Sequence, residues 1–424
     1  MSPKRKEESK TEEPKGYLSD DNKRNHIKFV FQDCNINFLI GSGLSTPFFE
    51  TLGKIEEWLT DLESAKDLLI SEEQYIFIKA SLYNAYFEVA MQGNIDILKF
   101  DDEVTEYVEI EDMDTPDDKK TKKLNNTFLS YKDFLNTLNH ILYERRSNTV
   151  SKQVNLFTTN IDIFLEKTLE YLDLHFNDGF NGIFNKKFSL SNFKKSFYQK
   201  SLQYDNISEI PVFNLLKVHG SVTWNMISQN IHFSELKIIR RIERLKGKEE
   251  LEFIEINNLN NEKWNEHKED LTIDEIIENA EEFDDIPNLS KFLRLYEKLQ
   301  IINPTKEKFK DTTFNKTYYE LLRLYANELE KENTVLFVMG FSMADEHIRE
   351  ITIRALKANP TLKVFFVAFK ESDKVKLNEY LENKPYHNLE IIEPEEFFGL
   401  QKFNEQILSP LLEEVRKSNN SKKY

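Results

Sequence analysis

A buried strand that ends in a glycine turn constrains the fold of this chain most strongly. Residues 35–40 (NINFLI) form a short apolar run, and residues 41–43 (GSG) interrupt it at once. In a nucleotide-binding α/β sheet the first strand turns into its first helix at such a point, and glycines let the backbone approach a phosphate. That helix would present unpaired N–H groups, with hydroxyl donors from Ser45 and Thr46 and with Pro47 at a first helical position. A plain structural turn of small residues is the alternative.

Length and charge limit the kind of protein that this chain can be. Its 424 residues are enough for a large core divided into two or three lobes. The net charge of −17 argues against nucleic-acid binding by the whole surface and against an anionic membrane partner, although local basic patches stay open. Cys34 is the only cysteine, which excludes intramolecular disulfides and a zinc site built from cysteines. With no long apolar run and no signal-type N-terminus, we expect a cytoplasmic chain.

Two charged stretches are expected to lie outside the folded core. Residues 1–27 contain almost no apolar side chains and are predicted to form a disordered tail, with a basic docking arm as the functional alternative. Residues 101–123 begin acidic and end basic. They lack the ordered spacing and the glycine of a calcium loop, so we expect a solvent-exposed loop there.

Apolar residues at helical spacing predict helices between the strands. We expect these helices over residues 53–67, 71–94, 131–146, 163–172, 318–329 and 346–356, from residue 372 onward, and near 403–416. Residues 249–285 are strongly acidic and mostly helical by pattern, with Trp264, Leu271, Ile273, Ile276 and Ile277 as the expected apolar face. Further strands are expected at 363–369 and 389–392.

Polar residues follow two other predicted strands. Strand 154–158 runs into residues 159–162 (TNID), and strand 213–218 runs into His219. Because ligands bind at the carboxyl ends of parallel strands, these side chains would face the same crevice as the glycine turn. Capping of the next helix accounts for one residue of TNID but not for the whole cluster. A lone histidine is usually structural, whereas one at a strand end can project into a crevice as a base.

Taken together, these segments resemble the sirtuin family. Residues 41–45 (GSGLS) resemble the family's GAGxS turn, residues 158–162 (TTNID) its TQNID segment, and residues 217–221 (KVHGS) its catalytic-histidine segment. Residues 336–348 (LFVMGFSMADEHI) resemble the strand and GxS turn that close the family's nucleotide site. Four motifs in the same order make this resemblance specific.

The resemblance implies an α/β fold: a Rossmann-like parallel sheet flanked by helices, with large helical insertions and no zinc ribbon. The sirtuin-like domain would span residues 28–424, with insertions at about 64–148 and 225–300. NAD would be the substrate and no metal would be bound. By the same resemblance the catalytic residues would be Asn160 and His219, and the NAD-binding residues would be Gly41, Ser42, Gly43, Ser45, Thr159, Asp162, Gly220, Gly340, Ser342 and Asp345. Asp345 could equally cap the helix that follows it.

Departures from the deacylase pattern narrow the implied chemistry. Sirtuin deacylases usually carry a zinc ribbon of two CxxC pairs, which a single cysteine cannot build. What remains is cleavage of the bond between nicotinamide and ribose, through a transition state that resembles an oxocarbenium ion. Asn160 would hold the ribose hydroxyls or the attacking water, and His219 would accept a proton. Because nicotinamide leaves as a neutral group, this chemistry requires no metal.

The zinc-free pattern with GFSxxDxHI resembles bacterial antiphage defence effectors, which deplete cellular NAD. Such an activity must be restrained, so we expect a homo-oligomer or a separate activating partner, with a HerA-type ATPase as the candidate. No membrane partner and no nucleic-acid binding by the bulk surface are expected. The alternatives are a non-catalytic sensor of NAD or ADP-ribose and a protein deacylase or ADP-ribosyltransferase. Hydrolysis and cyclisation of NAD are both open.

Overall fold

The fold is taken from a computed structural model of the chain. It describes residues 16–421 except 51–53, 66–70, 102–105, 108–114, 257–270, 304–315, 382–383 and 394–396, and the single residues 148, 204, 250, 282 and 284. Trp264 of the expected acidic insertion and residues 1–15 of the expected tail therefore lie outside the described residues.

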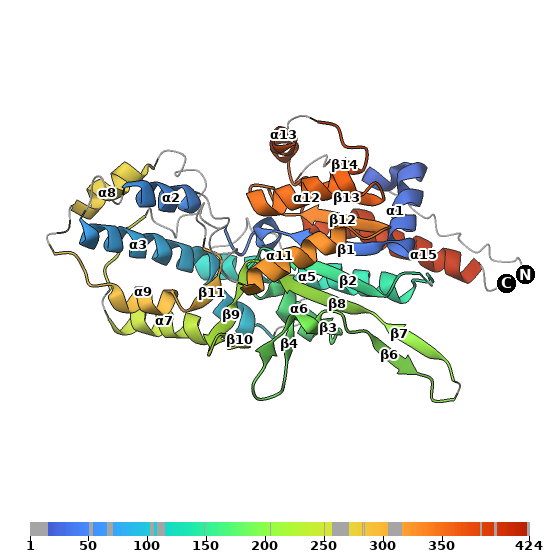
Figure 1. The fold of residues 1–424 in the computed structure, drawn as a ribbon, viewed down its shortest axis with the longest axis horizontal. Coiled ribbons are helices and arrows are strands. Elements are labelled where there is room, and N and C mark those ends of the chain that lie inside the picture. The colour runs from blue at the N-terminus through green and yellow to red at the C-terminus, as the bar shows by residue number, and fades with distance from the viewer. Residues whose placement is uncertain are drawn as a thin grey trace, which may run out of the picture.

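A seven-stranded parallel sheet forms the centre of the molecule (Figure 1). Its order is β14-β13-β12-β1-β2-β8-β3, so the chain leaves β1 on one side towards β2 and returns on the other side at β12. The predicted α/β fold with a Rossmann-like sheet is confirmed. The strands are β1 (Asn35–Ile40), β2 (Gln153–Thr158), β3 (Phe176–Asn177), β8 (Val212–Lys217), β12 (Thr334–Met339), β13 (Leu362–Val367) and β14 (Leu389–Ile392).

A ladder of four asparagines crosses the sheet from β1 to β3. Asn155 donates to Asn37 Oδ1 at 2.8 Å, Asn214 donates to Asn155 Oδ1 at 2.9 Å, and Asn177 donates to Asn214 Oδ1 at 2.9 Å. These residues are direct partners in the strand register. Because a slip of one residue would break every bond and bury unpaired amides, the ladder fixes the register of four parallel strands.

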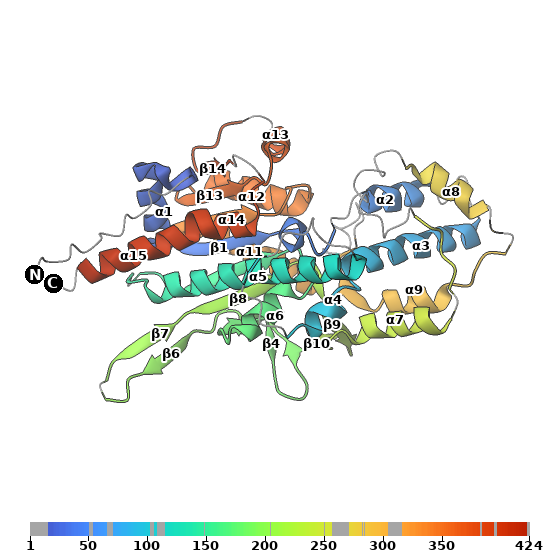
Figure 2. The same ribbon diagram turned by 180° about the vertical axis from the view of Figure 1, so that it is seen from behind.

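Helices cover both faces of the sheet. On one face Phe38 of β1 packs against Phe134 of α5, with ring centroids 5.2 Å apart, and on the other Phe157 of β2 packs against Tyr325 of α11 at 5.0 Å. Figure 2 shows α1, α5 and α15 on the first face, and Figure 1 shows α11 and α12 on the second. These helices are α1 (Asp21–Asp33), α5 (Pro116–Tyr143), α6 (Phe164–Tyr171), α11 (Lys316–Leu329), α12 (Glu346–Ala358), α13 (Glu371–Tyr380), α14 (Leu400–Phe403), the π-helix η4 (Asn404–Leu408) and α15 (Ser409–Ser421).

A helical lobe lies beyond one end of the sheet (Figures 1 and 2). Within it Tyr83 of α3 stacks on Tyr296 of α9 with ring centroids 4.3 Å apart, and Trp58 of α2 donates to the Leu271 carbonyl at 3.0 Å. In the part of the chain that the structure covers, no helix is long and apolar enough to cross a membrane. The lobe contains α2 (Ile55–Ala65), α3 (Glu72–Ala90), α7 (Lys237–Lys248), α8 (Ile273–Glu281) and α9 (Ser290–Tyr296), with α4 (Asn94–Lys99) between it and the sheet.

Two smaller sheets consist of short strands, most of which the sequence patterns did not predict. An antiparallel sheet has the order β11-β9-β10-β5-β4, and β6 pairs with β7 in a separate two-stranded sheet. Their strands are β4 (Phe180–Asn181), β5 (Lys187–Phe188), β6 (Phe197–Lys200), β7 (Ile207–Ile210), β9 (Gly220–Ile227), β10 (Asn230–Phe233) and β11 (Leu299–Ile301). The short 3-10 helix η3 (Leu190–Asn192) lies between β5 and β6.

Two predictions about the charged stretches were wrong within the described residues. The expected tail 1–27 is already helical from residue 16, where the 3-10 helix η1 (Gly16–Ser19) precedes α1 and buries Leu18. The expected loop 101–123 becomes helix α5 at Pro116, because Thr115 caps the helix and Pro116 takes its first position. In both places a local cap outweighs the high charge of the stretch.

Replacement of Asn214 tests the ladder. Asn214→Leu removes the partner of both Asn155 Oδ1 and Asn177 Nδ2 inside the sheet, so the free energy of unfolding in urea should fall by about 1–3 kcal/mol. Asn230→Leu serves as the control, because Asn230 makes its bond to the Ser228 carbonyl in an exposed turn, and a change within about 0.5 kcal/mol is expected. Equal losses in the two variants would contradict a role of the ladder in stability.

Candidate functional site

The loops after four neighbouring strands start at the same level of the sheet. Ile40 of β1 is in register with Thr158 of β2 and Met339 of β12, and Thr158 with Lys217 of β8. The glycine turn, the TNID segment, the HGS segment and the GFS turn therefore meet at the carboxyl edge of the sheet, at the point where the strand order reverses. The four predicted motifs thus share one edge.

Three glycines pack against one another where β1 and β12 end. Gly41 N–H donates to the Met339 carbonyl at 3.0 Å, and Gly43 N–H donates to the Gly340 carbonyl at 2.9 Å. A Cβ atom on Gly41 would lie 2.4 Å from the Gly340 oxygen, and Gly340 itself has φ +61°. Only glycine allows the two turns to approach this closely, so the first and last motifs form one backbone surface.

The turn after β1 differs from the predicted helix start. Residues Ser42–Ser45 form the short 3-10 helix η2, and Pro47 lies outside any helix, because the next helix, α2, begins only at Ile55. The expected contribution of a helix N-terminus at Pro47 was therefore wrong. The exposed Ser42 remains as a hydroxyl donor on this side, with the exposed Ser342 on the neighbouring turn.

Ser45 is the centre of a buried hydrogen-bond network. Its hydroxyl donates to Asp162 Oδ2 at 2.7 Å, accepts from Asn160 Nδ2 at 3.0 Å, and lies 3.1 Å from the Tyr131 hydroxyl. Burial, followed by the Asp162 charge, raises the pKa of Tyr131 well above its usual value, so the phenol keeps its proton. Asp162 Oδ1 accepts from the Phe164 N–H at 3.1 Å. Both oxygens of this carboxylate thus have partners inside the protein, and the carboxylate fixes the position of Ser45.

One polar atom of this network has no hydrogen-bond partner among the described residues. Asn160 is buried, and its Oδ1 makes no hydrogen bond to any described residue. Its amide nitrogen is held by Ser45, and its backbone N–H donates to Thr158 Oγ1 at 3.0 Å. The side chain is therefore fixed with an acceptor left over, and a buried acceptor without a donor costs free energy. A ligand that donates a hydroxyl or amide proton fits this position.

His219 forms a pair with Asp345 across the sheet edge. Nε2 of His219 lies 3.1 Å from Asp345 Oδ2, and the two side chains are 17% and 7% exposed. Asp345 also caps α12, since its Oδ1 accepts from the Ile348 N–H at 3.2 Å. The sequence left open whether Asp345 caps the helix or belongs to the NAD site; the cap is confirmed, and the same carboxylate lies beside His219, a second predicted site residue. With Nε2 directed at a carboxylate, Nδ1 of His219 is the nitrogen left to accept a proton.

Lys217 and Glu166, two residues without a predicted role, hold the backbone of the TNID segment. The buried Lys217 Nζ donates to the Asp162 carbonyl and to Glu166 Oε1, the latter at 2.8 Å. Burial raises the pKa of Glu166 although the Lys217 charge opposes this shift. A lysine at the end of the otherwise uncharged strand 212–217 was a signal for a buried ion pair. Tyr131 gave no such signal, because its helix is rich in aromatic residues.

Two of the predicted NAD-binding residues have structural explanations. A Cβ atom on Gly220, at φ +79°, would lie 2.0 Å from the Gln300 oxygen, so glycine is required there by the close approach of β11. Thr159 N–H donates to the Ile40 carbonyl at 3.0 Å and continues the ladder of the sheet. These contacts position the loops that carry Asn160 and His219.

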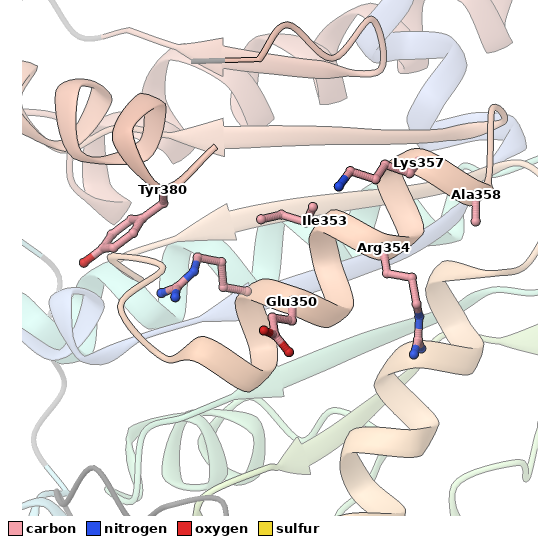
Figure 3. Close-up of a pocket in the computed structure, with 7 residues that line it drawn as sticks. Glu350, Ile353, Arg354, Lys357, Ala358 and Tyr380 are labelled. Carbon is pink, nitrogen blue, oxygen red and sulfur yellow. The ribbon is translucent and has the colours of Figure 1, made fainter. Parts of the chain in front are cut away.

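A separate open groove of about 730 Å³ lies between α12 and α13 (Figure 3). It is lined by Arg354, Lys357 and Glu350 of α12 and by Tyr380 of α13, and contains none of the predicted site residues. Arg349 joins it to the site, because its guanidinium stacks on Tyr380 at 4.6 Å and donates to the carbonyls of Met343 and Ala344. Arg349 therefore connects the lining of the groove to the loop that follows β12.

A comparison with models of protein families gives a match to part of this chain. A family model described as a SIR2-like domain matches residues 273–391, which include β12, the GFS turn, Asp345, α12 and β13. The glycine turn, Asn160 and His219 lie outside the matched residues. No curated protein matches the chain significantly. A SIR2-like domain implies use of NAD, and the match supports a place for this chain in the Sir2-type family.

Proposed function

We propose that this protein is an NAD hydrolase that cleaves NAD to nicotinamide and ADP-ribose. The observation that carries the proposal is the buried Oδ1 of Asn160, an acceptor without a donor at the carboxyl edge of the sheet. A ribose hydroxyl or the attacking water would supply that donor. The SIR2-like domain implies the same substrate independently.

The reaction breaks the bond between the nicotinamide nitrogen and the anomeric carbon of the ribose. Water adds its oxygen to that carbon and loses one proton, and nicotinamide leaves as a neutral molecule with the bonding electron pair. Positive charge spreads over the ribose in the transition state. The site must therefore orient the ribose, admit one water and accept one proton.

The described residues suit these three tasks. Asn160 is held rigid by Ser45 and would orient the ribose or the water through Oδ1. His219 would accept the proton at Nδ1, while the Asp345 carboxylate at Nε2 fixes the ring and balances its new charge. The turns at Gly41, Gly43 and Gly340 would let the pyrophosphate approach the backbone, as the resemblance to sirtuins implies.

The proposal predicts that NAD cleavage depends on both candidate catalytic residues. Asn160→Ala and His219→Ala should each lower kcat for nicotinamide release by about 10²- to 10⁴-fold, because each removes a positioned group at the reacting atoms. The measurement is a time course of NAD, nicotinamide, ADP-ribose and cyclic product with the purified chain. Tyr143→Ala is the control, because Tyr143 is an exposed side chain at the end of α5 and is not one of the predicted site residues, and this variant should retain most of kcat.

Different outcomes separate the alternatives. NAD binding by calorimetry without turnover, in the presence of every candidate activator, would contradict the hydrolase and leave a sensor. Faster NAD consumption with an acylated or acceptor protein than with water would indicate a deacylase or ADP-ribosyltransferase.

Asp345 should act through His219 as a positioning residue. Asp345→Asn keeps the cap of α12, because asparagine caps helices as well as aspartate does, but removes the charge that faces His219. We expect kcat to fall by about 10- to 100-fold with unchanged KM and thermal stability. Asp345→Ala should also cost about 1 kcal/mol of stability, since the cap is lost. If Asp345→Asn lowers kcat further in the His219→Ala background, it does not act through the histidine.

We propose further that NAD depletion serves antiphage defence and that a partner such as a HerA-type ATPase releases it. The support is the resemblance of residues 336–348 to the zinc-free branch of the family. Cells that carry the chain together with the ATPase should lose NAD soon after phage infection, and cells with His219→Ala should not. An equal loss of NAD in uninfected cells would contradict control by infection.

A further inference from the structure

Exposed apolar side chains are concentrated in one part of the molecule. Among the described residues 17 large hydrophobic side chains are exposed, and nine of them lie between residues 183 and 233. Three are almost fully exposed, namely Ile183 at 85%, Phe184 at 101% and Leu202 at 104%. The nine are Ile183, Phe184, Phe197, Tyr198, Leu202, Ile207, Met226, Ile227 and Phe233. A concentration of this kind marks an interaction site.

Six of these side chains lie on two hairpins, and the three most exposed of them lie in the hairpin turns. The β6–β7 hairpin and the hairpin that begins at β4 both project from the body in the two views of the molecule (Figures 1 and 2). Within the described residues β6 and β7 pair only with each other, which leaves both outer edges open. A two-stranded hairpin is marginally stable alone in water, and open apolar edges favour pairing with another chain. We call residues 183–210 the ribbon surface.

The ribbon surface is also basic, in contrast to the rest of the chain. The ribbon surface contains five lysines against two acidic residues, Asp205 and Glu209, which gives it a charge of +3, and Asp205 pairs with Lys200 at 3.1 Å. All five lysines are exposed, and Lys186 lies over the ring of Phe233 at 4.9 Å. The whole chain has a net charge of −17, so the residues outside the ribbon surface together carry −20. The five residues are Lys186, Lys187, Lys194, Lys195 and Lys200.

The opposite charge is found on another exposed element of the same chain. Helix α8 carries Asp274, Glu275, Glu278 and Glu281, all exposed, and contains no lysine or arginine. It lies in the helical lobe, at the far side of the molecule from the β6–β7 hairpin in both views (Figures 1 and 2). A contact between two ribbon surfaces would bring ten lysines together, whereas a contact with α8 of another copy pairs opposite charges.

We propose that the ribbon surface binds the acidic face of α8 on a second copy of this chain, in a head-to-tail contact. Such a heterologous contact joins copies into a closed ring or an open filament, according to the rotation between them. Apolar side chains would supply the buried area, and the lysines would select the acidic face and set the register. An anionic bilayer is the weaker fit, because it would repel the charge of −20 on the residues outside the ribbon surface.

The first test is the mass of the full-length chain in solution by light scattering after size exclusion. The wild type should form assemblies of several 50.4 kDa chains. Phe184→Asp combined with Leu202→Asp should raise the dissociation constant at least about 30-fold and leave monomers, as expected when central contact residues are lost. The control is Tyr319→Asp with Val375→Asp, at side chains that are 52% and 51% exposed on other helices, and it should assemble like the wild type.

A charge exchange tests the acidic face. Lys186→Glu with Lys187→Glu should prevent assembly, and so should Glu275→Lys with Glu278→Lys. When the two variants are mixed, each ribbon surface meets an α8 of opposite charge, and assembly should return. A mixture that stays monomeric would overturn α8 as the binding face.

Two further results would overturn the proposal. One is an assembly that survives the Asp substitutions on the ribbon surface, and the other is a monomeric wild type. If such a monomer binds phosphatidylglycerol vesicles and the variant does not, the surface is assigned to lipid. All these measurements report mass or sedimentation, so their outcome does not depend on whether the chain cleaves NAD.

Discussion

The asparagine ladder across β1, β2, β8 and β3 is the interaction on which the rest of the site depends. Hydrophobic strands in a parallel sheet can slide past one another at small cost, because one apolar contact resembles the next. Buried amides cannot, since each needs a donor and an acceptor at one defined height. Through Asn37, Asn155 and Asn214 the ends of three strands are brought to the same level. The loops with Ser45, Asn160 and His219 are thereby placed side by side.

A second constraint ties the two halves of the sheet together. The glycine contact between residues 41 and 340 occurs where the chain order reverses, so the first strand and the strand that returns far later form one continuous backbone surface. Side chains larger than hydrogen would separate β1 from β12 at this point. The Ser45 network follows β1 on one side of this contact, and the Asp345 cap follows β12 on the other side. The glycine contact therefore fixes the positions of the two groups relative to each other.

Much of this arrangement was predictable from the sequence, for a physical reason. Strands 154–158 and 213–218 are buried runs that end abruptly in polar residues, and the four motifs mark the carboxyl edge that parallel strands must share. The pairing of His219 with Asp345 was not predictable, because no local pattern joins residues so far apart. The small strands around Phe188 and Tyr198 were missed, since two to four residues carry no period. The helix starts at Asp21 and Pro116 were missed because both lie in highly charged stretches, which favoured solvent-exposed chain over a capped helix.

The two acidic–basic pairs at this edge have different consequences for the site. Lys217 and Glu166 are buried below the loops, where their charges compensate each other and where the pair holds the Asp162 carbonyl. Asp345 faces His219, whose charge changes with its proton, and the same carboxylate holds the first turn of α12. Removing charge from the first pair would therefore disturb the network that fixes Asn160. Removing charge from Asp345 while its cap is kept would leave that network intact and alter only the environment of the imidazole. The first pair is thus structural, and under the proposed function the second pair is the one that acts on a proton.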